Sequence, residues 1–308
     1  LLGCSPDRLG ATMCSAIGDR AELRLCSDDR GNRSFCDDGR GCLLCIPGQT
    51  RCRDDDLVEV CDVSGDGYVA GQPCTALGTS QVCYRGACVE MCEVAEKENS
   101  YMGCDYWGAD LDNAFVPGGN GYYDAAGAQY GMVISNPSPS RAATFTIASS
   151  DGPVLFDADQ APLDLSPIEP LGVRVLPLPR RDVDGTVVAP LAYHVTSSVP
   201  VSVVQFNPMT DEAVYSNDAS LLLPTTVLDR WYIVMTRQEV HQTLRSYLTI
   251  IATSPNPTKV AVTVTARTLA GEPSGIPALE PGDTIVRTLA QYDVLNIETN
   301  MPGGDLTG

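Results

Sequence analysis

Apolar and polar residues alternate along most of the chain after residue 104. A period of two is typical of β-strands that bury one face, and the segment KVAVTVTAR at 259–267 shows it clearly. No helical period of comparable length interrupts this region. The pattern predicts an all-β region with strands at 130–135, 143–149, 172–178, 191–197, 201–207, 230–236, 246–253, 259–267, 283–289 and 292–298.

Two of the predicted hairpins are similar to each other. MVISNPSPSRAATFTI (132–147) matches TIIATSPNPTKVAVTVTA (249–266), and Arg141 and Lys259 occupy corresponding positions. Because a Pro-rich turn blocks helix formation and helps to fix strand register, the repeat predicts antiparallel β-sandwiches in tandem.

We place the first sandwich at 105–218 and the second at 219–308. The second repeat stops before a counterpart of residues 191–207. We therefore expect the second sandwich to be incomplete at the C-terminus, with further sequence after Gly308.

The first 104 residues have a different pattern, in which apolar residues are sparse and cysteines are dense. A small domain with too few apolar residues for a core is usually held by disulfides, which form outside the cytoplasm. The spacing predicts a lipobox-like start with a cysteine-rich segment at 1–44 and a small disulfide-rich module at 45–104. Spacing alone does not give the pairing.

The chain has 13 cysteines, and an odd number in an exported protein needs an explanation. The start Leu1-Leu2-Gly3-Cys4 has the form of a lipobox, in which the cysteine would be acylated. Lipidation of Cys4 would leave an even set for disulfides: Cys14, Cys26, Cys36, Cys42, Cys45, Cys52, Cys61, Cys74, Cys83, Cys88, Cys92 and Cys104. The alternative is a Cys4–Cys14 bridge that leaves another thiol free.

Charge narrows the range of partners. The chain has 39 acidic and 20 basic residues, for a net charge of −19, so it would repel nucleic acid and anionic lipid headgroups. No apolar run approaches the roughly 20 residues that a transmembrane helix needs. We expect membrane contact only through a lipid anchor on Cys4.

Candidate chemistry is sparse. The two histidines are His194, expected on an exposed strand position, and His241, in a polar connection. The chain contains no Gly-x-Ser-x-Gly, His-Glu-x-x-His or phosphate-loop motif, so we predict no catalytic residues and no cofactor. Trp107 has either a packing role or a binding role. We favour packing, because Trp107 comes just after the last cysteine.

Metal binding is also disfavoured. Asp62, Ser64 and Asp66 have the spacing of a calcium loop, but Pro73 stands where the closing glutamate would be, so a glycine turn is favoured. For Asp110 and Asp112 we expect solvated or capping roles. The sequence therefore predicts no metal site.

Three sequence blocks in order support a family resemblance: GCDYWGADLDNAF, YHVTSSVPVSVVQFNP and SNDASLLLPTTVL. Together they resemble the N-terminal domain shared by IgGFc-binding proteins and many bacterial surface lipoproteins. The resemblance covers roughly residues 100–308 and implies an extracellular β-rich binding module. It transfers neither a ligand nor a site residue, because a shared fold does not carry a ligand with it.

These observations predict a non-enzymatic, lipid-anchored protein of the outer cell surface. Its function would be adhesion to, or recognition of, an extracellular protein or glycan. One alternative is a structural component that self-assembles into fibres, in which a neighbour's strand completes the second sandwich. Another is a hydrolase whose catalytic part follows Gly308.

Overall fold

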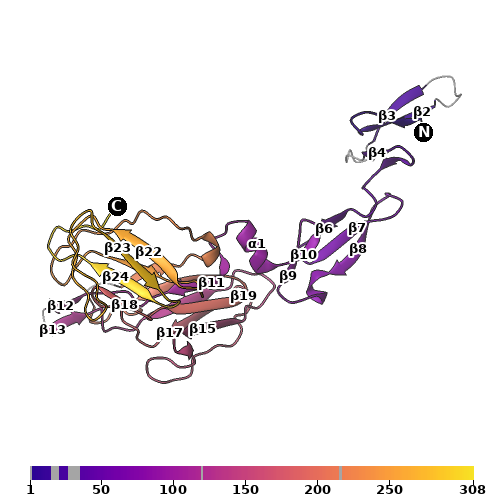
Figure 1. Ribbon diagram of the computed structural model, residues 1–308. Coiled ribbons are helices and arrows are strands. Elements are labelled where there is room, and N and C mark those ends of the chain that lie inside the picture. The colour runs from indigo at the N-terminus through magenta and orange to yellow at the C-terminus, as the bar shows by residue number, and fades with distance from the viewer. Residues whose placement is uncertain (1, 15–20, 27–34, 119–120, 215–216) are drawn as a thin grey trace. The chain divides into compact units, whose positions relative to one another are not determined.

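The computed structural model describes residues 2–14, 21–26, 35–118, 121–214 and 217–308, and for Cys14 the backbone alone. The chain divides into two compact units, Leu1–Val94 and Ala95–Gly308, which we call unit 1 and unit 2. Strands dominate both units (Figure 1), which confirms the predicted mainly-β fold class.

Unit 1 consists of small antiparallel sheets of two or three strands. The sheets are β1–β2–β3, β4–β5, β6–β7–β8 and β9–β10. The strands are β1 (Gly3–Cys4), β2 (Gly10–Cys14), β3 (Ala21–Leu25), β4 (Phe35–Asp37), β5 (Gly41–Leu43), β6 (Thr50–Cys52), β7 (Leu57–Cys61), β8 (Tyr68–Pro73), β9 (Gln81–Tyr84) and β10 (Ala87–Glu90), with a 3-10 turn η1 (Cys74–Ala76). The helix α1 (Met91–Lys97) follows β10.

Sulfur atoms fill the interior of unit 1. Five bridges link Cys4–Cys36, Cys26–Cys42, Cys45–Cys61, Cys52–Cys83 and Cys74–Cys88. Cys92 and Cys104 are also disulfide-bonded. Most of the buried apolar residues of unit 1 are cysteines, so covalent links take the place of an aliphatic core. A loop of about 15 residues closed in this way contributes roughly 3 kcal/mol in the chain-entropy model.

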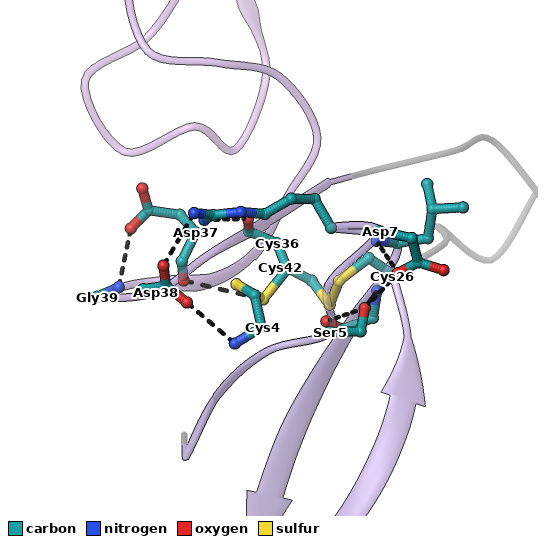
Figure 2. Close-up of a disulfide and its surroundings, with 12 residues drawn as sticks. Cys4, Ser5, Asp7, Cys26, Cys36, Asp37, Asp38, Gly39 and Cys42 are labelled. Atoms are coloured by element: carbon teal, nitrogen blue, oxygen red, sulfur yellow. Dashed lines mark hydrogen bonds and ion pairs between the residues drawn. A yellow bond between two sulfur atoms is a disulfide. The ribbon is translucent and has the colours of Figure 1, made fainter.

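The first cysteine differs from our expectation. Cys4 Sγ is bonded to Cys36, and the Cys4 backbone N–H donates to Asp38 Oδ1 at 3.1 Å (Figure 2). A lipid thioether needs the same sulfur atom, so the bridge and lipidation are alternative states of Cys4, and lipidation stays a prediction. The bridge also joins Cys36, not the Cys14 of the alternative, whose side chain lies outside the described residues.

Unit 2 is organised by one long strand, β19 (Tyr193–Asn207). Its first part pairs with β11 and β15, and its last part pairs with β14 and β20, which gives a seven-stranded sheet with β16 and β17 (Figure 1). The other members of this sheet are β11 (Gly103–Gly108), β14 (Gly131–Ser135), β15 (Phe145–Ser149), β16 (Gly152–Pro153), β17 (Val173–Pro177) and β20 (Asp218–Leu221).

The predicted strands at 191–197 and 201–207 are parts of this single strand. Pro200 cannot donate a ladder hydrogen bond, so two strands were expected. In the structure Pro200 lies where the pairing with β11 changes register, between the pairs Asp105↔Thr196 and Gly103↔Val201. The backbone continues because no regular ladder hydrogen bond is needed at that point.

The two predicted sandwiches are not separate in the structure. β18 (Val187–Ala189), from the predicted first sandwich, pairs with β24 (Val294–Glu298) from the second, and β21 (Tyr247–Ile251) completes that sheet. Ala192 and Val294 also share one apolar cluster. The remaining elements are the pairs β12 (Phe115–Gly118) with β13 (Gly121–Asp124) and β22 (Thr258–Thr263) with β23 (Thr284–Leu289), and the 3-10 turn η2 (Thr225–Val227).

Reduction should unfold unit 1 selectively. Its buried set is mainly cysteine, whereas unit 2 buries aliphatic and aromatic side chains that need no covalent link. We expect hydrogen exchange with a reductant present to show loss of amide protection in β7, with protection retained in β14 and β19. Equal loss in both units would show that unit 2 also depends on the disulfide of Cys104.

The state of Cys4 can be measured directly. Digestion of the exported protein without reduction should release one disulfide-linked species that contains both Cys4 and Cys36. Peptide mass spectrometry detects it, and reduction of the same digest is the control. An acyl mass on the Cys4 peptide, with Cys36 as a free thiol, would contradict the bridge and support the lipoprotein hypothesis.

Candidate binding cleft

A cleft of about 340 Å³ opens in unit 2 between the base of the β12–β13 hairpin and the segment 180–184. Three stretches of chain line it, at 111–115, 124–127 and 180–184. Its ionisable lining residues are Asp112, Asp124, Asp182, Asp184 and Arg180, so acidic groups dominate its walls.

The hairpin is fixed to the sheet at its base. Asn113 Nδ2 donates to the backbone oxygen of Asn207 at 3.0 Å, and Asn207 Nδ2 donates to the backbone oxygen of Leu111 at 2.5 Å. Above this base, the rings of Phe115 and Tyr122 stack with their centroids 4.5 Å apart, and both remain exposed. The cleft therefore has an exposed aromatic pair beside it, with Phe115 in its wall.

Arg180 neutralises part of the acidic wall. Its Nε donates to Asp182 Oδ1 at 3.1 Å, and its guanidinium also donates to the backbone oxygen of Ala126 at 3.2 Å. The hydrogen bond with Asp182 raises the pKa of Arg180 above its usual value. Arg180 pairs with Asp182 and also attracts Asp124, so a single cation faces the three carboxylates Asp124, Asp182 and Asp184 and the cleft keeps an excess of negative charge.

Asp110 lies behind the cleft and is 2% exposed. This excludes the solvated role, which was one of the two roles expected for it. Its Oδ2 accepts a hydrogen bond from the backbone N–H of Arg181 at 3.3 Å. Burial, with the hydrogen bond and charge of Asp182 as smaller causes, raises the pKa of Asp110 to about 8. Asp110 is therefore mainly neutral at pH 7.

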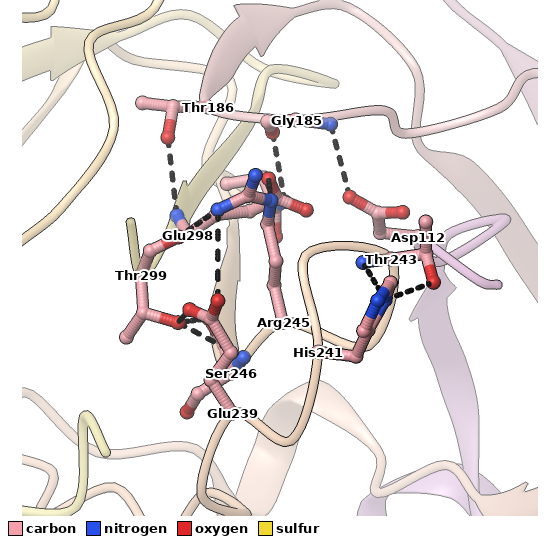
Figure 3. A network of polar contacts seen from close by, with 11 residues as sticks. Asp112, Gly185, Thr186, Glu239, His241, Thr243, Arg245, Ser246, Glu298 and Thr299 are labelled. Atoms are coloured by element: carbon pink, nitrogen blue, oxygen red, sulfur yellow. Dashed lines mark hydrogen bonds and ion pairs between the residues drawn. The ribbon is translucent and has the colours of Figure 1, made fainter. Parts of the chain in front are cut away.

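For Asp112 we had expected either a solvated or a capping role, and the structure shows capping. Its Oδ2 accepts a hydrogen bond from the backbone N–H of Gly185 at 2.9 Å (Figure 3). Gly185 has φ +66°, a left-handed conformation that favours glycine, so the turn that presents this N–H depends on the residue type.

A buried polar network connects Asp112 to the C-terminal segment of the chain (Figure 3). Burial, followed by a hydrogen bond with Asp112, raises the pKa of Glu298 to about 9, and burial raises the pKa of Asp112 as well. Such a carboxyl pair holds a shared proton. Arg245 Nε lies 3.5 Å from Glu298 Oε2, and its other side faces Glu239, at 3.9 Å.

His194 belongs to a separate packed cluster. Its Nε2 lies 2.9 Å from Asp105 Oδ2, and its ring stacks on Trp107 with centroids 4.2 Å apart. Burial raises the pKa of Asp105, but the hydrogen bond and charge of His194 outweigh it and hold that pKa below its usual value. Trp107 is 7% exposed and contacts Tyr292, so its role is packing.

The remaining candidates have structural partners. His194 is half-buried, contrary to the exposed position expected for it. His241 is exposed and its Nδ1 lies 3.1 Å from Thr243 Oγ1. Asp62 Oδ1 accepts hydrogen bonds from the N–H groups of Gly65 and Asp66, as in an ordinary turn. Within the described ranges, no group of three or more His, Cys, Asp or Glu residues could hold a metal ion.

Sequence reasoning had missed Asp124, Asp182 and Asp184. Asp182 and Asp184 stand close together in the stretch RRDVDG, so a local cluster of charge was visible. What brings them to Asp112 is long-range: the Val183 N–H donates to the backbone oxygen of Asp110 at 2.9 Å. No local pattern could supply that contact.

The buried carboxyls should make stability fall as pH rises. Their pKa values are raised above those of the unfolded chain, so between about pH 4 and pH 8–9 the folded protein holds protons that the unfolded chain has released. We expect Asp110→Asn to reduce the loss of unfolding free energy between pH 6 and 9 by on the order of 1 kcal/mol.

Denaturant melts at several pH values measure this effect. The control is Asp159→Asn, because Asp159 is an exposed carboxylate that should leave the slope unchanged. If Asp110→Asn and the parent protein have the same slope above pH 6, Asp110 does not hold its proton in the folded state.

Comparison with known proteins places part of this unit in a family. Residues 218–308 match the model of the family described as IgGFc binding protein. No curated protein and no solved structure matches the chain. The disulfides and this family fit an extracellular protein, and in the described residues no helix is long and apolar enough to cross a membrane. The predicted resemblance to this family is confirmed for residues 218–308, the part of the chain that matches its model.

Proposed function

We propose that unit 2 is a non-enzymatic extracellular recognition module, which binds an Arg or Lys side chain of a partner protein in its acidic cleft. The observation that carries this proposal is the combination of a carboxylate wall with the stacked pair Phe115 and Tyr122. Recognition of this kind would serve adhesion at the outer cell surface.

The charge of the cleft favours a cationic ligand. Arg180 pairs with Asp182 and also attracts Asp124, so the cleft lining keeps more carboxylates than cations. A cation is attracted to carboxylates, and the face of an exposed aromatic ring attracts the same group within about 6 Å. The two features lie at one opening, so they select the same side chain.

The position of the cleft connects it to the matched family domain. Asp112 lines the cleft, and its carboxyl bonds to Glu298 on β24, which lies within residues 218–308. The family domain therefore supports the wall from behind. A glycan could also stack on Phe115 and Tyr122, but the excess of acidic over basic groups in the lining favours a basic protein segment over a neutral sugar.

The test uses a short peptide with a central arginine, together with the same peptide carrying neutral citrulline. We expect the parent protein to bind the arginine peptide and to lose about tenfold in affinity in the double variant Asp124→Asn, Asp184→Asn. Asparagine keeps the hydrogen-bond acceptor at Asp124, so the hairpin should stay folded. Calorimetric titration measures both affinities.

Asp159→Asn is the control, because Asp159 is exposed and lies away from the cleft lining, so its substitution should leave binding unchanged. Equal binding of the citrulline peptide would exclude charge recognition. Binding of neutral oligosaccharides without binding of the arginine peptide would replace the protein partner by a glycan.

A further inference from the structure

We propose that residues 231–237 form an open strand edge in unit 2, to which an extended peptide segment of another protein adds as a β-strand. The surface is distinct from the acidic cleft, and four observations support it in turn: pairing on one side, an unpaired opposite edge, an exposed apolar row, and charge.

One side of this segment is already paired. Val234 and Gly308 exchange both of their backbone hydrogen bonds, at 3.2 and 2.9 Å. The Thr236 N–H donates to Thr307 Oγ1 at 3.0 Å. Reciprocal bonds of this kind define an antiparallel pair, so Val234 and Thr236 direct their backbone groups towards the chain at 303–308.

The opposite edge is open. Residues 231–237 are not part of a regular strand, but backbone groups of successive residues in an extended segment point to alternate sides, so we expect those of Trp231, Ile233 and Met235 to point away from 303–308. In the described part of the chain, nothing hydrogen-bonds to the backbone N–H or C=O of these three residues. An extended peptide can satisfy such a row, whereas a lipid or a sugar does not match its spacing.

The side chains along this edge are apolar and exposed. Trp231, Ile233 and Met235 are 90%, 89% and 88% exposed, whereas Val234 packs against the apolar core of the C-terminal part. Large apolar side chains exposed in a row are typical of an interaction surface. The period of two means that an added strand could place alternate apolar side chains beside them.

Charge favours a heterologous peptide over a second copy of this chain. Arg230 and Arg237 flank the row, in a protein with net charge −19. A second copy carries the same excess of negative charge, and repulsion between copies keeps such proteins monomeric. A strand with alternating apolar residues and an acidic group at each end matches both the row and its flanking arginines.

The chain contains a useful comparison. β17 ends the seven-stranded sheet and exposes Val173 and Val175, which are 58% and 55% exposed. The apolar side chains that β17 exposes are smaller than those of 231–237 and include no tryptophan. The same substitution on β17 therefore tests whether binding is specific to 231–237.

The probe is a synthetic peptide of alternating valine and threonine with an aspartate at each end. Of the two tryptophans, Trp107 is 7% exposed and Trp231 is 90% exposed, so addition of a strand should shift the fluorescence to shorter wavelength and protect Trp231 from acrylamide. The matched probe carries N-methyl groups at alternate residues, which remove the edge hydrogen bonds.

We expect the unmodified peptide to bind the full chain and Ile233→Lys to weaken binding about tenfold or more. Val175→Lys should leave the affinity unchanged. Because Ile233 is almost fully exposed, circular dichroism of Ile233→Lys should match the parent protein. Equal binding of the N-methylated peptide would exclude strand addition.

Two further results would overturn the proposal. Loss of binding in Val175→Lys, and not in Ile233→Lys, would move the site to β17. Concentration-dependent assembly in sedimentation velocity that Ile233→Lys abolishes would make a second copy the occupant. The cleft variant Asp124→Asn, Asp184→Asn should bind the strand peptide normally, so failure of either proposal is seen independently of the other.

Discussion

Unit 2 depends on the pairing of one strand. β19 is hydrogen-bonded to β11, β15, β14 and β20, which come from regions on both sides of it in the sequence. Its buried residues alternate with half-buried ones along the strand, so a shift of one residue would expose the whole apolar set. The register of β19 therefore fixes the position of nearly every other strand in its sheet.

The positions of the charged groups follow from this frame. The chain after β11 leads directly to Asp110 and Asp112, and β24 brings Glu298 to the same place. Burial keeps Asp110 and Glu298 largely protonated near neutral pH, because an ionised carboxylate in a buried position would be strongly destabilising. The acidic protein thus keeps these interior groups neutral and presents its negative charge at the cleft and the outer surface.

Local pattern predicted most strands of unit 2 but not their partners, and the strand predicted at 230–236 is not a regular strand in the structure. The alternating segment at 259–267 gives β22, and that at 143–149 gives β15, because each buries one face along its own length. Pro200 concealed the continuity of β19, since a register change on a distant strand makes that proline acceptable. The pairing of β18 with β24 was not predictable from an internal repeat, which reports similarity between segments and not contact between them.

The candidate cleft shows the same division. Asp110 and Asp112 stood out as carboxylates, but the environment that determines their pKa values comes from Asp182 and Glu298, far away in sequence. The cysteines show the same limit of local sequence information. Their density predicted a disulfide-held unit, yet the pairing of Cys4 with Cys36 depends on tertiary proximity.

The open edge at 231–237 raises the question of why it does not cause aggregation. Natural edges are protected by charge, by bulges or by coverage. Here the row of apolar side chains is uncovered, and the protection available is Arg230, Arg237 and the strong negative charge of the whole chain. Long-range repulsion opposes contact between identical copies but falls off within about 10 Å at moderate salt, so it does not oppose a small acidic-ended strand that approaches the arginines. The same charge distribution that opposes contact between identical copies therefore leaves this edge accessible to a different chain.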